Sequence, residues 1–194
     1  MAYNVVSDQL PTAVKLLVAG GFGVGKTTFV GSVSEIEPLT TEELITEASI
    51  GVDSLEGLSN KSTTTVAFDF GRISLSASLV LYLFGTPGQT RFWFMWDELS
   101  TGALGAIVLA DTRRLEACFE AVDFFEGRGI KFVVAVNQFD GAYQYDPEEI
   151  RSAIQLKPHV PITMCDARNP RSATSVLIQL IQHLLDSTMI TSPN

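Results

Sequence analysis

The chain has 194 residues, a hydrophobic content of 46% and a formal net charge of −9. This length is enough for one domain with a sizeable core, and the hydrophobic content excludes intrinsic disorder. The acidic charge argues against nucleic acid and anionic membrane surfaces as partners. The sequence shows no secretory signal and no apolar run near the roughly 18 residues that span a bilayer. We therefore expect a single cytoplasmic domain over residues 1–194 with no membrane anchor of its own.

Aliphatic runs alternate with helical patterns along the chain. Buried strands are expected at residues 14–20, 63–75, 79–85, 103–111, 130–137 and 160–167. Helices are expected directly after the first strand and at residues 112–129, 146–156 and 172–185. This order predicts an α/β fold of three layers, with helices on both faces of a mostly parallel six-stranded sheet. The hairpin at residues 76–78 predicts one antiparallel edge strand in that sheet.

The first strand leads into a glycine-rich loop. Residues 20–27, GGFGVGKT, fit the phosphate-binding pattern G-x-x-x-x-G-K-[ST] between a strand and a helix. Glycines let backbone N–H groups approach phosphate oxygens, and the helix presents its positive end to the same anion. We expect Lys26 to reach the β and γ phosphates and act in catalysis, and the Thr27 hydroxyl to ligate Mg²⁺. Nucleotide contacts are expected along this loop, with Phe22 and Thr28 as packing or orienting residues: Gly20, Gly21, Phe22, Gly23, Val24, Gly25, Lys26, Thr27 and Thr28.

Two later stretches resemble the switch motifs of small Ras-like GTPases. In TTTVAFDF, residues 63–70, Thr65 resembles the switch I threonine that closes over the γ-phosphate and completes Mg²⁺ coordination, with Thr64 as the alternative register. In FGTPGQTRF, residues 84–92, Gly88 matches the glycine whose backbone N–H senses the γ-phosphate. The resemblance makes Gln89 the catalytic residue that orients the attacking water.

Two further stretches resemble the guanine-binding motifs of the same family. NQFD, residues 137–140, supplies Asn137, Gln138 and Asp140. The Asp140 carboxylate would accept hydrogen bonds from guanine N1–H and its exocyclic amine, where adenine offers an acceptor instead. CDAR, residues 165–168, resembles the last motif, in which the Ala167 N–H meets guanine O6 and its neighbours line the base: Cys165 and Asp166.

The chain departs from the Ras-like pattern at three positions. Gly85 stands where that family has the aspartate that supports Mg²⁺, so Asp111 or Asp69 is a candidate substitute. Gln138 replaces the lysine that covers the guanine ring, which leaves stacking to Gln138 or Phe139. In the last motif, an arginine replaces the final lysine.

These departures narrow the resemblance to one group of Ras-like proteins. LFGTPGQTRFWF, VLADTRRL and VNQFDG look like the actinobacterial conservon-type GTP-binding proteins, relatives of the gliding-motility GTPases. That resemblance implies a signalling switch that works with a roadblock-type regulatory protein and a sensor kinase, which would recruit it to the membrane. Residues 35–61, with seven acidic side chains against Lys61, then form either a solvated loop or a docking surface for a basic partner.

The leading hypothesis is a switch that binds GTP or GDP with Mg²⁺, hydrolyses GTP slowly and presents its switch regions to an effector. Residues 35–61 contain no arginine and Arg91 is the nearest candidate in cis, so we expect a partner to supply one. Within RFWFMW, Phe92 and Trp96 are expected in the core and the other aromatics at an effector surface. The alternatives are a P-loop ATPase or small-molecule kinase, and a nucleotide-stabilised scaffold that does not hydrolyse.

Overall fold

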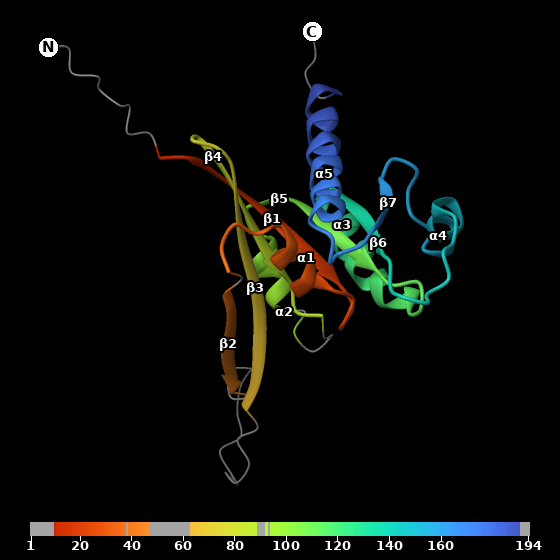
Figure 1. The fold of residues 1–194 in the computed structure, drawn as a ribbon, viewed down its shortest axis with the longest axis horizontal. Helices are drawn as coiled ribbons and strands as arrows, with labels where there is room; N and C mark the ends of the chain where they lie inside the picture. The colour runs from red at the N-terminus through yellow and green to blue at the C-terminus, as the bar shows by residue number, and fades with distance from the viewer. Residues whose placement is uncertain (1–9, 38, 47–62, 89–91, 93, 191–194) are drawn as a thin grey trace, which may run out of the picture.

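The structure is a computed structural model that describes residues 10–37, 39–46, 63–88, 92 and 94–190. Seven strands and six helical segments follow one another along this part of the chain (Figure 1). In chain order they are β1 (Thr12–Gly20), α1 (Lys26–Val33), β2 (Leu39–Thr46), β3 (Thr63–Ser76), β4 (Leu79–Gly85), α2 (Phe94–Ser100), β5 (Ala103–Ala110), the 3-10 helix η3 (Leu115–Cys118), α3 (Phe119–Arg128), β6 (Phe132–Asn137), α4 (Pro147–Ala153), β7 (Ile162–Cys165) and α5 (Pro170–Ile190).

All described strands belong to one sheet, in the order β2-β3-β4-β1-β5-β6-β7. The pairs from β4 through β1, β5 and β6 to β7 are parallel, whereas β3 runs antiparallel to both of its neighbours. The fold class predicted from the sequence is therefore confirmed, with a mostly parallel sheet, one antiparallel strand and flanking helices. All six expected strands are present.

The sheet has one more strand than the sequence predicts. β2 lies within the acidic segment 35–61 and pairs with β3 from Leu39 opposite Phe70 to Thr46 opposite Thr63. The antiparallel strand β3 is consequently internal, and the prediction that it forms the sheet edge is wrong. The sequence of β2, LTTEELIT, contains threonine and isoleucine, which are residue types favoured in strands, and β3 offers it an open row of backbone hydrogen-bonding groups. Charge alone had favoured a loop across residues 39–46.

Two apolar cores lie on opposite faces of the sheet. Because side chains alternate along a strand, β1 sends Leu16 and Val18 to one core and Leu17 and Ala19 to the other. The first core is closed by α1 and α5, and the second by α2, η3, α3 and α4. Every residue of β1 from Leu16 to Gly20 is buried, which holds the strand that leads into the glycine loop rigidly in place.

The helix boundaries follow local signals. Asp146 caps α4 by accepting a hydrogen bond from the Glu148 N–H at 2.8 Å, Glu149 reaches back to the Asp146 N–H, and Pro147 occupies the first turn. α3 ends at Gly129, whose φ of 65° is left-handed. The segment expected as one helix over 112–129 begins later, as η3 followed by α3.

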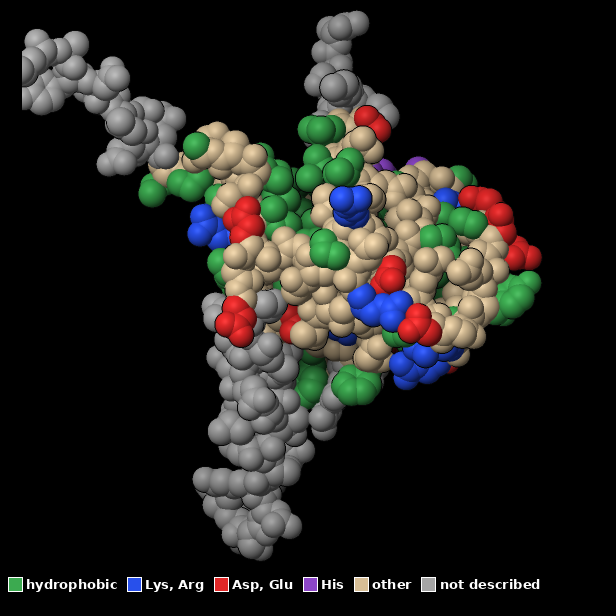
Figure 2. Space-filling model, in the orientation of Figure 1, with side chains coloured by type: hydrophobic (Ala, Val, Ile, Leu, Met, Phe, Trp, Pro, Cys, Tyr) green, Lys and Arg blue, Asp and Glu red, His purple; other side chains and the backbone are tan. Residues whose placement is uncertain are grey.

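The aromatic stretch after β4 divides between core and surface as expected. Phe92 and Trp96 are buried, whereas Phe94 keeps 52% of its surface exposed. On the face shown in Figure 2, acidic and basic side chains adjoin in several places, a run of acidic side chains follows the upper right edge, and basic side chains gather at the lower right. Among the helices of the described chain, none combines the length and the apolar composition needed to cross a membrane.

Replacing Phe125 by alanine should lower the free energy of unfolding by about 3–5 kcal/mol, since its fully buried ring contacts Trp96, Phe124 and Phe132. Phe119→Ala in the same helix is the matched control, because that ring is 40% exposed and its loss should cost much less. Urea unfolding of both variants measures the difference. Equal losses would contradict the described second core.

Candidate functional site

The loop between β1 and α1 has the backbone geometry of a phosphate-binding loop. Gly25, directly before α1, has φ 102°, and a Cβ there would lie 2.7 Å from Asn137 Nδ2. Gly20 has φ 131°, and its Cβ would lie 2.3 Å from the Leu109 carbonyl oxygen. Side chains are excluded at both positions by conformation and by space. The backbone from Gly20 to Lys26 can therefore turn tightly beside the end of β5.

Lys26 is held over this loop. Its buried ammonium donates to the carbonyl oxygens of Gly20 at 2.9 Å and Gly21 at 2.8 Å. Burial lowers the pKa of Lys26 to about 8, and the nearby Asp69 carboxylate opposes that shift. A polyphosphate beside this ammonium would favour its charged form, so the lysine is suited to bind an anion.

The residues at the start of α1 divide between core and exterior. Val24 is buried and contributes its backbone, whereas Phe22 is 66% exposed and Thr28 lies on the exposed side of the helix. The Thr27 hydroxyl donates to Asp69 Oδ2 at 2.8 Å. Because the hydroxyl proton is used in that bond, the oxygen keeps lone pairs for a cation. Thr27 thus fits a Mg²⁺ ligand bound together with phosphate.

Gly88, on the segment after β4, lies against the loop. A Cβ on Gly88 would approach Lys26 Nζ to 2.5 Å and Phe22 N to 2.9 Å. Trp96 of α2 fixes the preceding residue by donating from its indole nitrogen to the Pro87 carbonyl at 3.2 Å. The structure thereby places this glycine beside the expected phosphate position.

Asn137, the last residue of β6, joins the loop to the far end of the site. Its buried amide nitrogen donates to the Val24 carbonyl at 2.8 Å, and its amide oxygen accepts from the Ala167 N–H at 3.0 Å. Three loops, after β1, β6 and β7, therefore meet at one side chain. The Ala167 N–H, which we expect to meet guanine O6, is engaged by Asn137 here.

Asp140 and Arg168 form an exposed bidentate pair. Arg168 donates from Nη1 and Nη2 to the two Asp140 oxygens at 2.9 and 3.0 Å, and from Nε to Asp166 Oδ1 at 3.0 Å. The hydrogen bonds from Arg168 hold the pKa of Asp140 below its usual value. The arginine that replaces the final lysine of the last motif is therefore the direct partner of Asp140.

The other residues expected near the base contribute in different ways. Cys165 is buried, so only its backbone is available, and its carbonyl accepts from the Gln138 N–H at 2.7 Å. The Phe139 ring is covered on one face by the Arg113 guanidinium, 3.7 Å from the ring centroid. Asp111 Oδ1 accepts from Nε of the same arginine at 2.9 Å. Asp111 is thereby committed to Arg113, whose hydrogen bond also lowers the pKa of that carboxyl.

The described residues do not bring the whole expected site together. Gln89 and Arg91 are outside the described residues. Thr65 lies within β3, opposite Leu44 of β2, and the alternative Thr64 lies opposite Ile45. Figure 1 shows that β2 and β3 run on beyond the end of β4. The roles assigned to Thr65 and Gln89 stay predictions.

Sequence reasoning missed Arg114. Its Nη2 donates to the Phe22 carbonyl at 3.0 Å and lies 3.5 Å from the position of a Cβ on Gly23. It comes from the segment after β5, and β5 pairs in parallel with β1. Residues that follow adjacent parallel strands meet at the same sheet edge, so the strand order would have revealed it.

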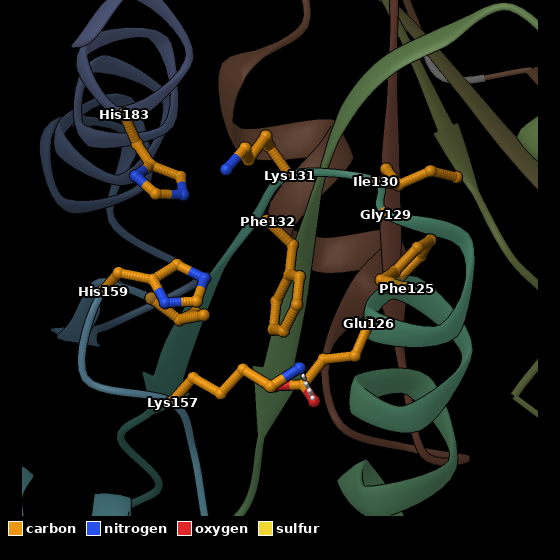
Figure 3. Close-up of a pocket in the computed structure, with 10 residues that line it drawn as sticks. Phe125, Glu126, Gly129, Ile130, Lys131, Phe132, Lys157, His159 and His183 are labelled. Atoms are coloured by element: carbon orange, nitrogen blue, oxygen red, sulfur yellow. Dashed lines mark ion pairs between the residues drawn. The ribbon is translucent and has the colours of Figure 1, made fainter. Parts of the chain in front are cut away.

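A separate pocket of about 200 Å³ lies at the opposite end of the strands (Figure 3). It is lined by Phe132 at the start of β6 and by basic and imidazole side chains that include Lys131, His159 and His183. The glycine loop follows the carboxyl end of β1, which runs parallel to β6 through β5. This pocket is therefore not part of the site around Lys26.

Solved structures with the same fold include cytosolic domains and G domains of FeoB iron transporters. The cytosolic domain of T. maritima FeoB in a GDP form superposes with a TM-score of 0.63 and 16% identity over 91% of this chain, which spans 65% of that domain's length. The FeoB G-domain from Methanococcus jannaschii gives a TM-score of 0.59 and 12% identity, over 89% of this chain and 98% of that one. These likenesses establish a P-loop GTPase fold.

Two further comparisons concern sequence. An uncharacterized protein of Methanocaldococcus jannaschii is 27% identical over 129 residues, which cover 66% of this chain and 71% of that protein. The family described as conserved hypothetical ATP binding protein matches residues 18–187, which include the glycine loop, Asn137 and Ala167. Because this match covers most of the chain, the protein belongs to that family of nucleotide-binding P-loop proteins.

Proposed function

We propose that the protein is a GTP-binding switch that binds GTP or GDP with Mg²⁺ and hydrolyses GTP slowly to GDP and phosphate. The observation that carries the proposal is the meeting of the phosphate loop with the Asn137 and Ala167 segments through one buried amide. That junction holds a phosphate-binding loop and the carboxylate of Asp140 at the same edge of the sheet. A guanine nucleotide would use both, the loop for its phosphates and the carboxylate for its base.

The Asp140–Arg168 pair supports guanine as the base. A guanidinium presents two parallel N–H donors, and Asp140 accepts both at 2.9 and 3.0 Å. Guanine presents a similar pair through N1–H and its exocyclic amine, whereas adenine presents an acceptor at N1. Arg168 would have to release Asp140 when the base binds. The exposure of the carboxylate, 85% of its side chain, allows this exchange.

ATP is the second candidate nucleotide, since the family that contains this chain is described as ATP-binding. A P-loop ATPase would use the same glycine loop and Lys26 but would gain nothing from the Asp140 carboxylate. The two candidates therefore differ in their dependence on that one side chain.

Hydrolysis would depend on few groups of this chain. Mg²⁺, held by Thr27 and by phosphate oxygens, would neutralise charge on the β and γ phosphates. Thr65 would become the second protein ligand only by leaving its place in β3 opposite Leu44. Lys26 would stabilise the same charge, Gly88 would donate its N–H to the γ-phosphate and Gln89 would orient the attacking water. An arginine supplied by a partner would accelerate the reaction by about 10³–10⁵-fold.

The proposed partners follow from the likeness to conservon-type GTP-binding proteins. They are a roadblock-type regulatory protein, a sensor kinase and an effector on the switch regions, and these partners would recruit the switch to the membrane. Phe94, 52% exposed on α2 directly after the switch II segment, is suited to such an effector contact.

Nucleotide affinity should fall as pH rises through the pKa of Lys26. With a pKa of about 8 in the free protein, raised by bound phosphate, GDP should bind roughly tenfold more weakly at pH 9 than at pH 7. Isothermal titration calorimetry at the two pH values measures the change. Lys26→Arg, which stays charged throughout, should show no such decline; an equal decline in that variant would exclude Lys26 as its source.

Asp140→Asn should weaken GTP binding by at least about 100-fold, leave ATP binding unchanged and strengthen binding of the xanthine nucleotide. The companion variant Arg168→Ala removes the internal competitor and should bind GTP at least as tightly as the wild type. Competition with a fluorescent nucleotide measures all three affinities. If Asp140→Asn leaves the ratio of GTP to ATP affinity unchanged, guanine recognition by this residue is excluded and ATP becomes the leading candidate.

Gln89→Leu should bind GTP normally and lose the slow single-turnover hydrolysis of the wild type. Phosphate release measured with excess protein over GTP reports the rate. If neither the wild type nor the Gln89→Leu variant releases phosphate, the result would support the non-hydrolysing scaffold. Rapid hydrolysis, at several turnovers per second and unaffected by Arg91→Ala, would contradict the requirement for a partner arginine.

A further inference from the structure

The carboxylate nearest the proposed metal ligand comes from an unexpected strand. Asp69 belongs to β3, and its Oδ2 accepts the Thr27 hydroxyl proton at 2.8 Å. In the Ras-like pattern the supporting aspartate comes instead from the position that corresponds to Gly85, at the end of β4. The structure therefore contains a carboxylate at the threonine, although the expected position lacks one.

Gly85 makes room for this carboxylate. Asp69 and Gly85 lie directly opposite each other in the antiparallel β3–β4 ladder. A Cβ on Gly85 would stand 2.9 Å from Asp69 Cβ and 2.9 Å from Asp69 Oδ2. Opposite residues of an antiparallel pair point to the same face of the sheet, and at these distances a side chain on Gly85 would overlap that of Asp69. The glycine and the aspartate are consequently complementary.

Burial shows that Asp69 is not an ordinary surface carboxylate. Only 8% of its surface is exposed, and the buried ammonium of Lys26 lies close enough to interact with its charge. Burying a charged carboxylate is unfavourable unless partners compensate for the lost hydration. The Thr27 bond uses one acceptor position of a group that offers about four, which leaves capacity for metal-bound water.

Asp111, the other candidate, is occupied. It follows β5 on the opposite side of β1 from β4, and its two oxygens accept from Arg113 Nε at 2.9 Å and Nη2 at 2.8 Å. A carboxylate neutralised by a bidentate guanidinium is a poor partner for a cation. The described part of the chain also brings no group of three or more His, Cys, Asp or Glu side chains together as a metal site. Any Mg²⁺ would thus depend on phosphate and hydroxyl oxygens, which makes the orientation of Thr27 important.

We propose that Asp69 is the positioning residue for Mg²⁺ in this protein and replaces, from the adjacent strand, the carboxylate that Gly85 lacks. It orients the Thr27 hydroxyl so that the oxygen lone pairs face the nucleotide, and it accepts hydrogen bonds from metal-bound water. The inference rests on the proposed nucleotide function and adds the source of its metal support. Asp69 acts through Thr27 and water and is not a catalytic residue.

The test is the dependence of GDP affinity on Mg²⁺. For each variant, GDP affinity is measured with excess Mg²⁺ and with EDTA. The affinity in Mg²⁺ divided by the affinity in EDTA, here called the Mg²⁺ ratio, gives the effect of the metal. Asp69→Asn, which keeps the size of the side chain and an acceptor oxygen, should reduce that ratio at least about tenfold and leave the affinity in EDTA nearly unchanged. Mn²⁺ binding to the GDP complex, followed by electron paramagnetic resonance, should weaken in parallel.

Moving the carboxylate provides the decisive variant. Gly85→Asp alone should lower the melting temperature, because its Cβ would be 2.9 Å from Asp69 Cβ. The double variant Asp69→Gly/Gly85→Asp should recover stability and restore the Mg²⁺ dependence that Asp69→Asn loses. Asp111→Asn is the matched control, a buried carboxylate on the other side of β1 whose loss should leave the Mg²⁺ ratio unchanged.

The outcomes separate this inference from the proposed function. A wild type that binds neither GDP nor GTP, in EDTA or in Mg²⁺, would overturn the proposed function itself. A wild type that binds GDP, with a Mg²⁺ ratio that is equal to one or is unaffected by Asp69→Asn, would overturn only the role of Asp69. A loss of the ratio in Asp111→Asn but not in Asp69→Asn would assign the role to Asp111 and likewise overturn the inference.

Discussion

The buried amide of Asn137 is the constraint on which the site depends. It donates to the carbonyl of Val24 in the glycine loop and accepts from the N–H of Ala167 after β7. Both bonds are shielded from water, so loss of the side chain would leave buried backbone groups without partners. Gly25 must be a glycine because this amide lies against it. The same contact therefore fixes the shape of the glycine loop and the position of the loops that follow β6 and β7.

The charged side chains around this junction have partners of opposite charge. The buried ammonium of Lys26 is opposed by one buried carboxylate, Asp69, while Asp111 is neutralised by Arg113. On the exposed side, Arg168 engages both Asp140 and Asp166. Each charged group that faces the proposed ligand thus has a partner in the free protein. Binding a nucleotide would exchange partners rather than bury new unpaired charges, which keeps its electrostatic cost low.

The family description names ATP, whereas the proteins with a similar fold include domains solved with GDP. The family carries a description of ATP binding, whereas the structural neighbours are G domains at 12–18% identity, a likeness that shows the fold alone. The glycine loop does not discriminate, because phosphate is common to both nucleotides. The proposed function assigns the choice of base to Asp140, whose carboxylate accepts two parallel N–H donors from Arg168. The base, and not the phosphate, is therefore where this protein's specificity must be measured.

The sequence by itself determined the glycine loop, six of the strands and the α/β architecture, because these depend on local patterns of glycine spacing and hydrophobic periodicity. It also predicted base-binding segments at the ends of β6 and β7, and the structure joins these segments to the glycine loop through Asn137. Only the tertiary structure decided that Leu39–Thr46 forms a strand, that Arg114 reaches Phe22, that Arg168 occupies Asp140, and that Asp69 lies where Gly85 leaves space. Each of these depends on which strands lie side by side. Strand neighbours that are distant along the chain leave no periodic trace in the sequence, so such contacts appear only when the sheet is assembled.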